Sequence, residues 1–143
     1  MLETPHSLVG GAIGAATGNP YAAAALGTGS HFVGDLVPHW NPEFPFKGKA
    51  LYALAIADFV IAEALVVAFW FWFPDRPEIA IGAFFGTVPD IILGIRFTFK
   101  VRWLRRYQDI HKKLNVELPF KYGLWPQLVL SVLSAWYLVS VHG

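Results

Sequence analysis

The stretch from Ser30 to Asn41, SHFVGDLVPHWN, is the one around which the chain is organised. It places His31, Asp35 and His39 four residues apart, which on a helix is one face. A histidine and an aspartate at this spacing can bind one metal ion. His39 would lie about 12 Å along a helix from His31, but Pro38 predicts that the helix ends or kinks there and lets His39 fold back. The alternative is a helix end with a capping aspartate and two interfacial histidines.

The composition indicates an integral membrane protein that forms one domain over residues 1–143. The chain is 55% hydrophobic and 15% charged, and soluble domains carry roughly 25% charged residues. Because cysteine is absent, disulfides and thiolate ligands are excluded, and any metal must bind histidine, carboxylate or backbone oxygen. These donors suit Zn, Mn, Mg or non-haem Fe. No Lys or Arg precedes the first apolar run, so we expect no cleaved signal peptide.

The apolar pattern predicts an all-α bundle of about five membrane helices, at residues 5–17, 20–37, 47–73, 78–97 and 123–141. Thr4 and Pro5 predict the N-cap and the first residue of the first helix. The first two helices are rich in glycine and alanine, which lets helix backbones approach closely in a bilayer. We therefore expect a tight central hairpin. The first helix is short for a full span, so a partly re-entrant path stays open.

A basic segment separates the last two predicted spans. Seven of the eleven Lys and Arg residues lie between Arg96 and Lys113. An apolar stripe through residues 96–116 predicts an amphipathic helix on anionic lipid rather than on nucleic acid. The positive-inside rule places this segment in the cytoplasm. Five crossings then give a cytoplasmic N-terminus in a bacterial or archaeal inner membrane, whereas the oligomeric state stays open.

This topology brings ionisable groups from separate segments to the cytoplasmic side. A charged side chain at the bilayer centre costs roughly 2.5–3.5 kcal/mol, and the spans contain almost no Lys or Arg, so histidines and a metal are the available partners for the aspartates. The candidates exceed the four ligands of one zinc ion, which favours two ions with a bridging carboxylate. The predicted metal ligands are His6, His31, Asp35, His39, Asp58 and Asp90.

Three further ionisable groups lie outside this set of predicted ligands. His111, on the basic segment, is the predicted catalytic residue, as a general acid or a headgroup contact. Glu63 lies deeper and His142 falls on the opposite side, so both are excluded. For Asp90, a helix cap after Pro89 is the competing interpretation, and each aspartate alone could be a hydrogen-bonded structural residue.

Two parts of the sequence resemble known families. The segment from His31 to His39, HFVGDLVPH, resembles the metal motif of zinc-dependent phospholipase C and the related fungal single-strand nucleases, with a shorter last interval. The segments Thr4 to His6, TPH, and Gly86 to Asp90, GTVPD, resemble the small inner-membrane metal-dependent hydrolases, without their further Asp-His step. The resemblance implies a metal-dependent hydrolase of phosphoesters or lipids that uses zinc.

Two other function classes stay open. Aspartates and histidines inside a membrane also form proton or cation relays in transporters and channel subunits. A lipid-docking scaffold would use the basic segment alone. A polar path that reaches Glu63 and the outer face would favour transport, and a bound metal with an open water position would favour the enzyme.

Overall fold

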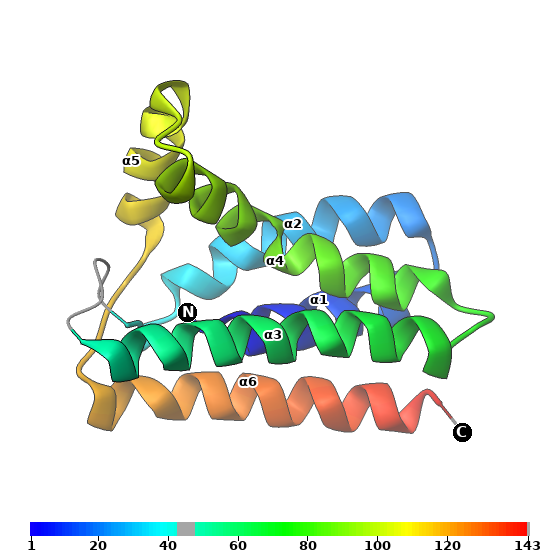
Figure 1. Ribbon diagram of the computed structural model, residues 1–143. Helices are drawn as coiled ribbons and strands as arrows, with labels where there is room; N and C mark the ends of the chain where they lie inside the picture. Colours follow the sequence, from blue (N-terminus) through cyan, green and yellow to red (C-terminus); the bar gives the residue numbers. More distant parts are fainter. Residues whose placement is uncertain (43–47, 143) are drawn as a thin grey trace.

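The computed structural model in Figure 1 describes residues 1–42 and 48–142. Every regular element in these two ranges is helical, which confirms the all-α prediction. The elements are α1 (Glu3–Thr17), α2 (Pro20–Leu36), α3 (Lys49–Trp72), α4 (Pro77–Thr98), the 3-10 helix η1 (Arg102–Leu104), α5 (Arg105–Leu114) and α6 (Phe120–Ser140).

Helix α1 is central, since it packs against α2, α3, α4 and α6. Its Gly10 and Gly14 approach α4 so closely that a β-carbon at either position would overlap the carbonyl groups of Gly82 and Glu78. Gly27 of α2 faces the same Gly82 carbonyl. The small residues thus bring three helix backbones into contact, as the glycine-rich hairpin predicts.

Among the described residues, three helices, α3, α4 and α6, are long and apolar enough to cross a membrane. Large apolar side chains such as Phe71 on α3 and Val139 on α6 are exposed on their outer surfaces, as expected of helices that face lipid. The helices α1 and α2 are shorter, with 15 and 17 residues. The chain is therefore a membrane protein with three candidate spans, and the predicted five are not confirmed.

The basic segment is not the single helix predicted for residues 96–116. Helix α4 ends at Thr98, Lys100 adopts a positive φ of 53°, and the chain then forms η1 and α5. Left-handed backbone at a lysine cannot continue a right-handed helix, so α5 takes a direction of its own (Figure 1). Helix α4 instead continues through Pro89. Asp90 is therefore not a cap at a helix break.

Hydrogen bonds tie the end of α2 to the segment that links α5 and α6. The Asp35 carbonyl accepts from Val116 N at 2.9 Å, and His39 N donates to Val116 O at 3.0 Å. The His39 carbonyl accepts from Leu118 N at 2.6 Å. These bonds place the beginning of the loop after α2 beside the end of the basic segment. The cytoplasmic location of both stays a prediction, and residues 43–47 of that loop lie outside the described ranges.

Candidate metal centre

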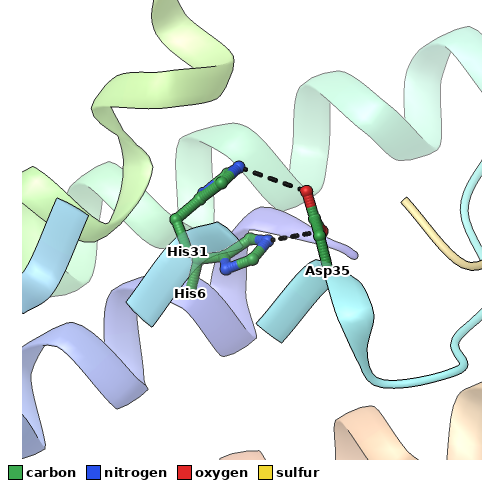
Figure 2. Close-up of side chains that lie close together, drawn as sticks. All are labelled: His6, His31 and Asp35. Carbon is green, nitrogen blue, oxygen red and sulfur yellow. Dashed lines mark ion pairs between the residues drawn. The ribbon is translucent and has the colours of Figure 1, made fainter. Parts of the chain in front are cut away.

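Asp35 lies at the centre of four buried histidines. Figure 2 shows its carboxylate facing the rings of His6 from α1 and His31 from α2, with an ion pair to each. Its Oδ1 lies 3.3 Å from His6 Nε2 and 3.8 Å from His39 Nε2. Its Oδ2 lies 3.4 Å from His31 Nε2 and 3.1 Å from His111 Nε2. The chain turns after α2 and brings His39 back to Asp35, and α5 brings His111 to it. Segments far apart in the sequence thus form one cluster.

In the part of the chain that the structure describes, two sets of three side chains have ligand atoms close enough to hold a metal ion. They are His6, His31 and Asp35, and His31, Asp90 and His111, and within each set the atoms lie within 4.8 Å of one another. A tetrahedral zinc ion with bonds of about 2.1 Å separates its ligand atoms by about 3.4 Å. The distances of 3.1–3.8 Å around Asp35 are therefore close to those of such a donor set. On the His6 side, the Met1 amino group that contacts Asp35 would have to move to admit an ion.

Backbone carbonyl groups orient two of the histidines. His31 Nδ1 lies 2.8 Å from Gly86 O, and His39 Nδ1 lies 2.8 Å from Val37 O. Since only a ring N–H can bond to a carbonyl oxygen, each Nδ1 carries the hydrogen. In the neutral ring the lone pair is then on Nε2, which both residues direct toward Asp35. Histidines that bind metals are commonly held in this way.

Two buried acceptor atoms of the cluster, His39 Nε2 and Asp35 Oδ2, have no hydrogen-bond partner. Burial lowers the pKa of His39, and the positive charge of the Met1 amino group adds to this effect. The ring is thus neutral at neutral pH and its Nε2 is an acceptor. A cation near His39 Nε2 and the carboxylate 3.8 Å away would satisfy both, because burying unsatisfied polar groups is costly.

The cluster also includes groups that sequence reasoning missed. The Met1 amino group donates to the Asp35 carboxylate and lies 3.4 Å from His6 Nε2. The Tyr107 ring stacks on His111 with centroids 6.0 Å apart, and its hydroxyl donates to Pro89 O at 2.9 Å. The four-residue spacing of Tyr107 and His111 on α5 was a usable sequence signal, whereas nothing in the sequence pointed to Met1.

Asp58, predicted as a metal ligand, binds the beginning of α1 instead. Its carboxylate accepts from Glu3 N at 2.6 Å and from Thr4 N at 3.3 Å. The N-cap position of α1 is Leu2, which offers no side-chain cap, so Asp58 satisfies the free donors of the first turn from a neighbouring helix. The predicted cap Thr4 donates its hydroxyl to Asp58 O at 3.4 Å. We therefore leave Asp58 out of the ligand set.

The other predicted site residues lie together around Asp35. Glu63 and His142, which sequence reasoning excludes, lie outside this cluster. Glu63 accepts from Thr87 Oγ1 at 2.9 Å, and His142 accepts from Trp72 Nε1 at 2.7 Å. Asp90 Oδ1 lies 3.7 Å from His31 Nε2 and 3.4 Å from His111 Nε2. The residues that meet are His6, His31, Asp35, His39, Asp90 and His111.

Comparison of the chain with protein-family models, curated proteins and solved structures finds no match.

Proposed function

We propose that this chain is a membrane-embedded, metal-dependent hydrolase of phosphoesters, with zinc as the first candidate metal and Mn, Mg and Fe as alternatives. The observation that carries the proposal is that the two carboxylate oxygens of Asp35 face different histidines. One of its oxygens faces His6 and His39, and the other faces His31 and His111. A carboxylate whose two oxygens face different imidazole nitrogens has the form of a bridging ligand for two ions.

In this proposal the ligands divide into two groups. His6 would hold one ion with Asp35 Oδ1 in place of the Met1 amino group, with His39 as the next nearest donor. His31 and His111 would hold the other with Asp35 Oδ2, beside Asp90. Divalent ions at such a site supply an activated water and stabilise a leaving oxygen. If a single ion binds on the His6 side, His111 is free to act as the general acid.

Asp90 connects the cluster with its surroundings. Its side chain is 22% exposed, whereas those of Asp35 and His31 are 0% exposed. It can therefore bind the attacking water or accept its proton. In the hydrolysis, the water oxygen bonds to phosphorus, the ester P–O bond breaks, and the alcohol leaves with a proton.

Elemental analysis of detergent-purified protein tests the proposal. We expect about one or two divalent ions per chain in the wild type and in a His142→Ala control, whose substitution lies outside the cluster. Asp35→Ala should lack them. The wild type should also hydrolyse a water-soluble phosphodiester, and a chelator should stop this reaction. Near-zero metal in all three proteins after supplementation with Zn, Mn, Mg and Fe would contradict the proposal.

A proton or cation relay is the second candidate function. It is favoured by the bond between Thr87 and Glu63, because Thr87 follows Gly86, whose carbonyl accepts from His31. This series of polar groups leads from the cluster into α3. A relay predicts that Glu63→Gln abolishes ion flux in proteoliposomes. The hydrolase predicts that Glu63→Gln retains metal and hydrolysis.

A further inference from the structure

Two clefts adjoin at Asp90. One, of about 370 Å³, lies between the beginning of α1, the first half of α3 and the second half of α4. The other, of about 420 Å³, lies between α4, α5 and the loop after α2. Each is within the range of about 300–1,000 Å³ typical of ligand pockets. Asp90, Leu93 and Phe97 line both clefts, so one extended molecule can occupy both and pass the metal cluster.

The cleft between α3 and α4 suits a hydrocarbon chain. Its walls include Ala55, Ile56 and Phe59 from α3 and Gly94 from α4. Both helices are candidate membrane spans, so this cleft lies where a lipid chain can enter from the bilayer. A β-carbon at Gly94 would meet nothing within 4 Å, which leaves this position open.

The cleft beside α5 suits an anionic headgroup. Gln108, Lys112 and Asn115 line it together with His111, and amide and ammonium groups donate to phosphate oxygens. Helix α5 carries further Arg and Lys residues, and basic groups at a membrane surface attract anionic lipids. The carboxylates of Asp90 and Glu117 also line this cleft, so a phosphate there depends on Lys112 and on the proposed metal ion. The cleft between α3 and α4 has no Lys, Arg or His among the described residues that line it.

We infer that the substrate is a membrane phospholipid with an anionic headgroup, bound with its phosphate beside Asp90 and α5 and an acyl chain between α3 and α4. A water-soluble phosphoester would fill the polar cleft alone. The inference rests on the proposed function for the hydrolytic step, whereas binding of the lipid can be measured independently of it.

Photo-crosslinking tests the path of the acyl chain. The protein is reconstituted in phosphatidylcholine vesicles that contain phosphatidylglycerol with a diazirine in its acyl chain, and the labelled peptides are mapped by mass spectrometry. Labels should fall on α3 and α4 around Ile56 and Gly94. Gly94→Leu should reduce this labelling at least about fivefold, because a side chain then fills the cleft. Gly29→Leu, at another open helical glycine, is the matched control and should match the wild type.

A neighbouring pair of lysines tests the headgroup. Lys112 lines the polar cleft, and Lys113 is not among its lining residues. Labelling by phosphatidylglycerol should exceed labelling by diazirine-bearing phosphatidylcholine in the wild type. Lys112→Gln should reduce this preference by about fivefold, and Lys113→Gln should leave it closer to that of the wild type.

The outcomes separate the lipid site from the hydrolase. If Gly94→Leu and Gly29→Leu are labelled alike, or if labels spread evenly over the outer faces of α3 and α6, the lipid site is wrong, even where metal-dependent hydrolysis of a soluble diester persists. If labelling follows the expected pattern but the protein binds no metal and cleaves no diester, the lipid site stands and the hydrolase is wrong.

Discussion

The Nε2 atoms of His31 and His111 lie 2.9 Å apart, although 80 residues separate the two histidines in the sequence. Because His31 Nδ1 donates its hydrogen to Gly86 O, the neutral His31 ring offers a lone pair at Nε2. His111 must then provide the N–H between them when no cation is bound. A metal ion would take the place of that hydrogen and bind both rings.

This short distance makes His111 a candidate metal ligand, and its effect on metal affinity can be compared with that of His142. His111→Ala should weaken metal binding at least about tenfold, the loss common when groups that support a metal site are removed. His142→Ala should leave the affinity unchanged, since His142 bonds to Trp72. Competition with a metal-sensitive dye in detergent measures both affinities. Equal affinities in the two variants would remove His111 from the site.

Asp58 provides a prediction about stability rather than metal binding. Asp58→Ala leaves the first-turn donors of α1 without their acceptor and should lower the free energy of unfolding by about 0.5–2 kcal/mol, as loss of an N-cap does. Asp58→Asn keeps a carbonyl oxygen and should lose less. Thermal unfolding in detergent and the metal content are measured together. A loss of metal in correctly folded Asp58→Asn would restore Asp58 to the ligand set.

The contact between α1 and α4 depends on glycine at position 10. Gly10→Ala would place its β-carbon against the Gly82 carbonyl, and such overpacking costs about 1–3 kcal/mol. Gly94→Ala lies in open space on a helix and should be neutral or stabilise the protein by up to about 1 kcal/mol. Thermal unfolding of the two variants checks the difference. Equal stability would mean that the helices can separate without cost.

Much of the site could be predicted from local spacing. The interval between His31 and Asp35 fixes their common helical face, and Pro38 predicts that the chain turns and brings His39 back. The approach of His111 could be predicted only coarsely, from the shared side of the membrane. Its final position depends on the turn at Lys100 and on the bonds from Val116 to α2, which no local pattern specifies.

The wrong predictions have a common physical origin in contacts between helices. The sequence predicts that the buried carboxylate of Asp58 has a partner, and it does. The partners are backbone N–H groups of α1 rather than the predicted metal ion. Thr4 has the sequence of an N-cap, yet Asp58 from α3 takes that role. The alternative interpretation of Asp90 as a cap after a helix break at Pro89 is also excluded, because α4 continues through Pro89, as the span predicted for residues 78–97 requires. Sequence periodicity does not reveal which neighbouring helix supplies an acceptor.

Tyr107 links α5 to α4 through its hydroxyl, and this bond has a predictable pH dependence. Tyr107→Phe should lower the free energy of unfolding at pH 7 by about 1 kcal/mol. Burial, with the nearby charge of Asp90, raises the pKa of Tyr107 above its ordinary value. The stabilisation is therefore complete below the ordinary tyrosine pKa of about 10 and falls as the pH rises above it, because the unfolded chain then loses the proton more readily.

Chemical unfolding of both proteins at pH 7 and pH 11 measures this difference. The stability gap between the wild type and Tyr107→Phe should narrow at the higher pH. Tyr21→Phe is the control, because Tyr21 is 87% exposed. A gap that stays constant with pH would show that the hydroxyl bond is not the source of the stabilisation.

Single cysteines can establish how the bundle lies in the membrane, because the chain has none of its own. Helix α3 is about 36 Å long, enough to cross the hydrocarbon core, and Figure 1 shows the turn between α3 and α4 at the end opposite α5. With α3 as a full span, Lys49→Cys and Lys113→Cys should react with an impermeant maleimide from the cytoplasmic side, and Asp75→Cys from the other side. The basic residues of α5 set this orientation. Reaction of Asp75→Cys and Lys113→Cys from the same side would mean that α3 does not cross the membrane, and the lipid path between α3 and α4 would lose its basis.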